Sequence, residues 1–144
     1  RNIHITGNTT LFVRISTDGG ATYEGDGDYQ AVYANFPASA SATTSYSLAT
    51  ASASGIMLLP AILGSQGAIH TMDFILDNPA GTANLKTSRV VSAGIDSGTR
   101  VFSGHGAGLH VTKTSAVNAI KIFSAANSIA AAEVAVYGIN YTAP

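Results

Sequence analysis

The sequence contains no cysteine, and this absence removes two classes of small protein from consideration. Without cysteine there can be neither a disulfide framework nor a zinc site built from thiolates. A small extracellular domain that lacks disulfides needs another source of stability, and contacts between subunits can supply it. The absence of cysteine does not by itself assign a compartment.

Charged residues are also scarce, at 10% of the 144 residues, whereas an ordinary globular domain has about a quarter. Disordered chains are rich in charge and poor in apolar residues, but here 46% of the residues are hydrophobic, so we expect one folded domain over residues 1–144. So few charges do little to keep a large free surface in solution. We therefore expect a surface covered by partner subunits, as in a homo-oligomer, or coated with Ser, Thr and Asn.

Two kinds of partner are excluded by what the chain lacks. The seven Lys and Arg residues are scattered and the net charge is −1, so no basic stripe is available for nucleic acid. No apolar run approaches the length of a bilayer span, and the longest, "GIMLLPAILG", is interrupted by Pro60. We predict no nucleic-acid partner and no membrane span.

Motifs of catalysis are missing as well. The chain has no Gly-x-Ser-x-Gly elbow, and its carboxylates lie in no informative motif. The glycine-rich "SGHGAG" (103–108) lacks the Lys-Ser/Thr of a nucleotide-binding loop, and we expect it to form a wide turn. We predict a protein that is not an enzyme and needs no cofactor.

What the chain does have is alternation of apolar and polar residues. In "TLFVRIS" (10–16), Leu11, Val13 and Ile15 share one face, which is the pattern of a half-buried strand. "TDGG" (17–20) follows as a tight turn, and "YQAVYANF" (29–36) as the next strand. Further strands are expected near 46–48, 55–63, 68–76, 84–94, 100–103, 109–115, 117–125 and 132–140.

Short strands at regular spacing predict an all-β fold, an antiparallel β-sandwich that is jelly-roll-like with about eight to nine strands. A helix over 124–133 is the alternative for one segment. The last two strands are expected to form a buried closing hairpin over 117–140. Its inward residues would be Ile120, Ile122, Val134 and Val136.

Metal-binding residues offer one weak pattern. Calcium prefers oxygen ligands on a flexible loop, and "DGGATYEGDGD" (18–28) supplies carboxylates between glycines. A solvated acidic loop is the alternative, and we favour it. The calcium candidates are Asp18, Glu24, Asp26 and Asp28. His105 and His110 have no neighbouring carboxylate in sequence, so we interpret them as surface or packed histidines and predict no metal site.

Six tyrosines and no tryptophan suggest a second kind of site, because tyrosine offers both a stacking face and a hydroxyl to a sugar or a protein. Rigid sandwiches present function through their loops. The candidate ligand contacts are therefore loop residues, namely Tyr23, Asp26, Asp28, Tyr29, Arg100 and His105. We interpret Tyr33 and Tyr137 as packing residues at sheet rims.

Two segments carry a resemblance to a known family. "FVRISTDGGATYEGDGDYQAVYANF" (12–36) and "AVNAIKIFSAANSIAAAEVAVYGIN" (116–140) resemble the opening and closing motifs of small β-sandwich domains in tailed-phage virion proteins of the tail-fibre or receptor-binding type. Between them the chain fits in strand pattern alone, and Glu133 stands where the family more often has Gly-Thr. The resemblance carries no catalytic residue.

The resemblance implies a jelly-roll-like sandwich located in the virion. Such a domain would be a structural component of a tail, a fibre or the capsid surface, and a trimer is favoured. Its partners would be copies of itself, other virion proteins and a host surface glycan used in host attachment. The alternative hypothesis is a free carbohydrate-binding module.

Overall fold

The computed structural model describes residues 2–5, 9–25, 27–37, 45–59, 69–95, 101–111, 114–126 and 129–138. Every regular element in these ranges is a strand. They are β1 (Asn2–Ile5), β2 (Leu11–Ser16), β3 (Tyr29–Pro37), β4 (Ser45–Ala53), β5 (Ile56–Leu59), β6 (Ile69–Leu76), β7 (Lys86–Ile95), β8 (Val101–His110), β9 (Ala119–Ser124) and β10 (Ile129–Ala132). Within the described residues there is no helix long and apolar enough to cross a membrane.

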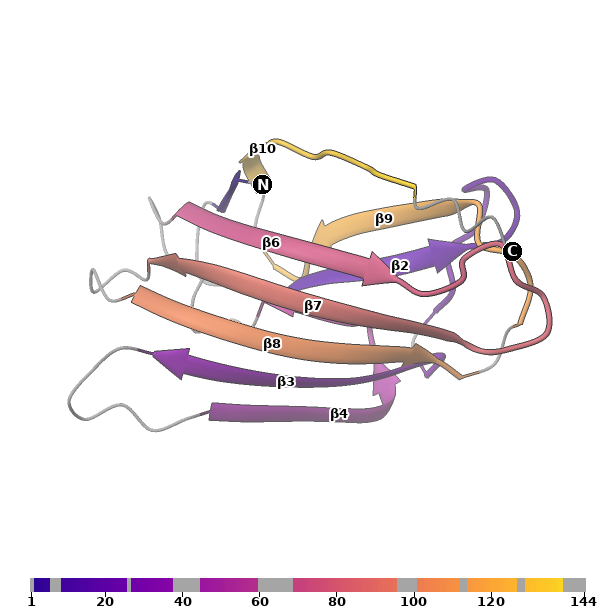
Figure 1. The fold of residues 1–144 in the computed structure, drawn as a ribbon, viewed down its shortest axis with the longest axis horizontal. Helices are drawn as coiled ribbons and strands as arrows, with labels where there is room; N and C mark the ends of the chain where they lie inside the picture. The colour runs from indigo at the N-terminus through magenta and orange to yellow at the C-terminus, as the bar shows by residue number, and fades with distance from the viewer. Residues whose placement is uncertain are drawn as a thin grey trace, which may run out of the picture.

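The strands form two antiparallel sheets (Figure 1). The larger sheet has the order β10-β1-β6-β7-β8-β3-β4, and the smaller has the order β5-β2-β9. Buried side chains from both sheets make one apolar core, which includes Leu11, Val13 and Ile15 of β2 and Tyr33 of β3. The predicted all-β sandwich is confirmed, with ten strands in the described ranges.

The pairing scheme is that of a chain folded back on itself. β1 pairs with β10, β2 with β9 and β3 with β8, each antiparallel, so the two halves of the chain pair from the ends inward. Nested pairing of this kind, wrapped into two layers, makes the fold jelly-roll-like. It also explains why β1, which the sequence reading omits, is needed: it is the partner of β10.

The predicted closing hairpin is wrong. β9 pairs with β2 in the small sheet, whereas β10 pairs with β1 in the large sheet, so the two segments belong to different layers. Ile122 packs against the core as expected, whereas Ile120, also predicted to point inward, is exposed. Val134 and Val136 follow β10 outside any strand and are 57% and 80% exposed, and Tyr137 beside them is exposed too. Apolar alternation alone does not say which strand a segment pairs with.

The glycine-rich segment 103–108 is a strand and not a wide turn. It is the middle of β8, which runs without a break between β3 and β7. Alternation places Gly104, Gly106 and Gly108 on the inner face of the sheet, where a side chain would otherwise stand. The glycines therefore serve packing and not chain reversal.

Two neighbouring side chains occupy the space that these glycines leave. Tyr33, directly opposite Gly106 on β3, lies so close to β8 that a Cβ on Gly106 would come within 2.9 Å of its ring, and one on Gly104 would collide with its hydroxyl end. That hydroxyl is hydrogen-bonded to Ser92 on β7. Tyr33 thus spans three strands, which is the known way in which an aromatic residue compensates for a strand glycine.

The second side chain is Ile56 of β5, which comes from the opposite sheet. A Cβ on Gly108 would lie 2.6 Å from Cγ2 of Ile56 and 2.9 Å from the Ser88 hydroxyl. Gly108 is paired with Ala31 on β3 and with Ser88 on β7. Three small residues therefore lie side by side on the inner face of the large sheet. The small sheet fits into this row.

The chain reaches β5 through a sheet-to-sheet corner at Ser54 and Gly55. β4 pairs with β3 in the large sheet, and β5 pairs with β2 in the small one. A Cβ on Gly55 would lie 2.7 Å from the carbonyl oxygen of Val13, so the backbone can pass this close to β2 only with glycine at the corner.

We predict that Gly108→Ala destabilises the protein by about 1–3 kcal/mol, because the added methyl group overpacks a region that Ile56 already fills. Unfolding by urea, followed by circular dichroism, measures the effect. Gly25→Ala is the matched control, since a Cβ there meets nothing within 4 Å. Equal stability of the two variants would contradict the packing described for β8.

Candidate functional site

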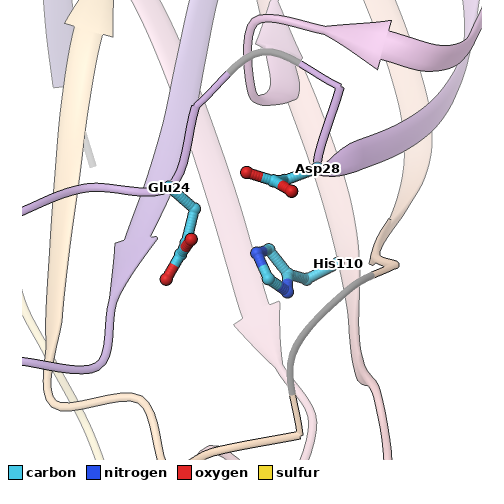
Figure 2. A group of neighbouring side chains, drawn as sticks. All are labelled: Glu24, Asp28 and His110. Atoms are coloured by element: carbon cyan, nitrogen blue, oxygen red, sulfur yellow. The ribbon is translucent and has the colours of Figure 1, made fainter.

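Glu24, Asp28 and His110 gather at the end of the sandwich where β3 begins and β8 ends (Figure 2). Each offers one ligand atom, and these atoms all lie within 4.8 Å of one another. The His110 side chain is completely buried, whereas the two carboxylates are half-buried. Figure 2 shows the three side chains pointing toward a common space, with one ring nitrogen of His110 facing the carboxylates.

Backbone hydrogen bonds fix the segments that carry these three residues. Tyr29 and His110 are directly paired in the β3–β8 ladder, and Val111 N–H donates to the carbonyl of Asp28 over 2.8 Å. Glu24 N–H donates to the carbonyl of Ile15 over 3.1 Å, which holds the loop against β2. The position of the cluster is therefore set by strand register and by the loop's attachment to β2.

A tight turn brings Glu24 and Asp28 to the same side. Gly25 N–H donates to the Asp28 carboxylate over 3.1 Å, and Gly27 adopts a φ of 94°, which favours glycine. The glycines of "EGDGD" thus have a specific use. They fold the acidic segment back so that two of its carboxylates approach the end of β8.

Tyr29 supports the cluster from inside the core. Its ring meets the His110 ring edge-on at 5.1 Å, and its hydroxyl accepts a hydrogen bond of 2.9 Å from Ile15 N–H. Burial raises the pKa of Tyr29 to about 12. The hydroxyl links the two sheets, because Tyr29 belongs to the large sheet and Ile15 to the small one.

Asp18 does not join the other calcium candidates. Its carboxylate accepts hydrogen bonds from Thr22 N–H and from the hydroxyls of Thr22 and Ser16, so it closes the turn that follows β2. These bonds, those from Thr22 first, hold the pKa of Asp18 well below its ordinary value. Asp26 lies outside the described residues. Of the predicted set, Glu24 and Asp28 come together, and their third partner is a histidine.

Among the predicted ligand contacts that the structure describes, Tyr23 and His105 do not lie together. Tyr29 is wrong as a contact residue, because its side chain is fully buried. Tyr23 lies beside Lys121 of the small sheet, with the ammonium 5.8 Å from the ring centre. His105 stands on the outer face of the large sheet, on the opposite side of the sandwich, where it meets the Phe36 ring at 6.0 Å. Asp26 and Arg100 lie outside the described residues.

The sequence reading missed the connection between His110 and the acidic loop. One signal could have revealed it. If "VFSGHGAGLH" is taken as one strand, period two places His110 on the same face as Phe102 and therefore inside, at the end of the strand. The assumption that the glycines formed a loop hid this alternation.

The outer face of the large sheet is the second notable feature. Alternation on β3, β7 and β8 turns apolar side chains outward on neighbouring strands, and several are about half exposed. We call them the outer patch: Val32, Phe36, Val91, Ile95 and Val101. Two of them, Ile95 and Val101, are paired directly across β7 and β8.

On the outer face of the small sheet, cations flank the aromatic side chains. Phe12 and Phe123 stack across β2 and β9 with ring centres 5.7 Å apart. The guanidinium of Arg14 lies 5.1 Å from the Phe123 ring centre and the ammonium of Lys121 lies 5.9 Å from it, so cations flank the aromatic pair. Cations thus cover part of the outward aromatic surface of the small sheet.

Among protein-family models, curated proteins and solved structures, none matches this chain. We therefore infer the function from the surfaces and side chains of this chain.

We predict that Tyr29→Phe lowers the free energy of unfolding by about 1–3 kcal/mol, because the buried Ile15 N–H loses its acceptor while the ring still fills its place. Chemical denaturation of both proteins measures the difference. Tyr23→Phe is the control, since that ring is half-buried and lies at the surface beside Lys121. An unchanged midpoint for Tyr29→Phe would contradict the hydrogen bond between the sheets.

Proposed function

We propose that this protein is a non-enzymatic structural component of a phage virion, a β-sandwich that assembles with copies of itself through the outer patch. The observation that carries the proposal is the exposure of apolar residues on the middle strands of the large sheet, with Val101 59% and Val91 47% exposed. We interpret exposed apolar residues that share one face of a sheet as a candidate interaction site. The low charge of the whole chain agrees with a subunit that is covered in its assembly.

The charges around the outer patch favour a second copy of the chain as its occupant. In one row across the sheet, Val91 stands between Asp73 on β6 and His105 on β8, and in the next row Arg89 faces Ile75 and Ala107. Both signs of charge therefore border the apolar residues. A surface that carries both signs can pair with charged residues of either sign on a neighbouring copy of the chain.

The virion assignment is supported by the resemblance of residues 12–36. Its strand, Asp-Gly-Gly turn and second strand correspond to β2, the turn at 17–20 and β3. Gly19 and Gly20 have positive φ values of 78° and 88°, so the two glycines serve the turn that the motif implies. The closing motif is less regular, because its "AVYG" lies after β10 and outside the strands. A trimer at the tail, the fibre or the capsid surface is the form that the resemblance favours.

A free carbohydrate-binding module remains the alternative, but the positions of its proposed contact residues give it less support. Its contact set depended on loops that share one end of the sandwich. Tyr23 and His105 lie on opposite faces, and Tyr29 is buried. Glycan binding would then be a property of the assembled virion protein, at a site formed between copies or with another virion protein.

We predict that the purified chain forms a trimer at micromolar concentration and that Val91→Asp shifts it toward monomer. The introduced carboxylate would be buried without a partner in the interface, at a cost of several kcal/mol. Size-exclusion chromatography with light scattering measures the mass. Thr82→Asp, at an exposed turn position, is the control and should leave the mass unchanged.

A monodisperse monomer of the unaltered chain at that concentration would contradict self-assembly. An oligomer that Val91→Asp does not affect would instead place the interface elsewhere. Circular dichroism of the variant keeps these readings separate from a failure to fold.

A further inference from the structure

We propose that Glu24, Asp28 and His110 form a binding site for one divalent transition-metal ion, with Zn²⁺ as the best-matched ion. This site is separate from the outer patch. The three residues come from the loop after β2, from the position just before β3 and from the end of β8. A bound ion would tie these segments together.

The distances are compatible with one ion. Donor atoms in a tetrahedral zinc site lie ~3.3 Å apart, as follows from zinc–ligand bonds of about 2.0–2.1 Å. The three candidate atoms already lie within 4.8 Å of one another, so the side chains need to close by a small rotation only. The backbone at each position is held by the hydrogen bonds described above, and Asp28 and His110 flank the paired strands β3 and β8.

The ligand types decide which class of ion would bind. Ca²⁺ and Mg²⁺ take oxygen ligands, so a buried imidazole in the group disfavours both. Imidazole nitrogen with carboxylate oxygen is a set that Zn²⁺ accepts, and the chain has no thiolate to compete. Two carboxylates would neutralise the charge of the ion in this partly enclosed place.

Neighbouring residues hold His110 and Asp28 in their positions. His110 is the last residue of β8 and is completely buried, an unusual position for a polar ring at a strand end. Tyr29 covers one side of the ring from within the core. Gly27 permits the turn that brings Asp28 back toward Glu24. The arrangement is therefore built into the fold and does not depend on chance approach of surface side chains.

Titration calorimetry of the full chain, first freed of metal with a chelator, tests the proposal with ZnCl₂ as the probe. We expect one Zn²⁺ per chain with a dissociation constant in the micromolar range or below. Glu24→Gln keeps the size of the side chain and removes its charge, and it should weaken binding by roughly tenfold or more. His105→Ala is the matched control, because it removes an exposed histidine from the outer face and should leave binding unchanged.

Thermal unfolding supplies a second readout. ZnCl₂ should raise the midpoint temperature of the unaltered chain and of His105→Ala, because the ion binds the folded state, and should raise it less for Glu24→Gln. CaCl₂ at the same concentration should have no comparable effect. Glu24→Gln carries the test because its half-buried position tolerates the change, whereas a substitution of buried His110 endangers the fold.

Three results would overturn the proposal. The first is the absence of zinc binding to the unaltered chain. The second is zinc binding that Glu24→Gln leaves intact or that His105→Ala abolishes, which would be adventitious binding by surface groups. The third is stabilisation by calcium and not by zinc, which would mean an oxygen-only site.

Discussion

Tyr33 and Ile56 pack over the glycines of β8, and this packing joins β3 to β8 and the small sheet to the large one. β8 lies inside the large sheet and presents almost no side chains to the core between Phe102 and His110. Tyr33 fills this gap along the sheet, and Ile56 fills it from the opposite layer. Their positions determine the register of β3 against β8 and the approach of the two sheets, because any added side chain at these glycines would collide with them.

The same register also places the candidate metal ligands. With Tyr33 opposite Gly106, the strand pairing brings Tyr29 opposite His110, and Asp28 then stands just before the start of the ladder. Alternation along these strands turns the apolar residues of the outer patch away from the core. The candidate metal site and the outer patch thus both follow from the alignment of β3, β7 and β8.

Much of the fold could be predicted from the sequence, and the failures have physical causes. Alternation of apolar and polar residues identified β2 and β6, and "TDGG" identified the turn after β2. β3 and β7 were also expected as strands, but the buried face of β7 is mostly polar, so apolar alternation does not indicate which side of it points inward. β8 was divided wrongly, because its inward residues are glycines and the usual apolar signal is missing. The closing hairpin failed because pairing partners are decided by long-range packing. Of the site, the acidic loop was noticed, but the meeting of Glu24 and Asp28 with His110 depends on a register that no local pattern contains.

The central functional claim is that the outer patch is covered in the assembled protein, and the lack of native cysteine makes one measurement direct. A single thiol introduced by Val91→Cys can be titrated with a polar alkylating reagent over a range of chain concentrations, beside Thr82→Cys on an exposed turn. The account predicts that the reaction at position 91 slows as the concentration rises, while the reaction at position 82 does not. Equal and concentration-independent rates at both positions would contradict it.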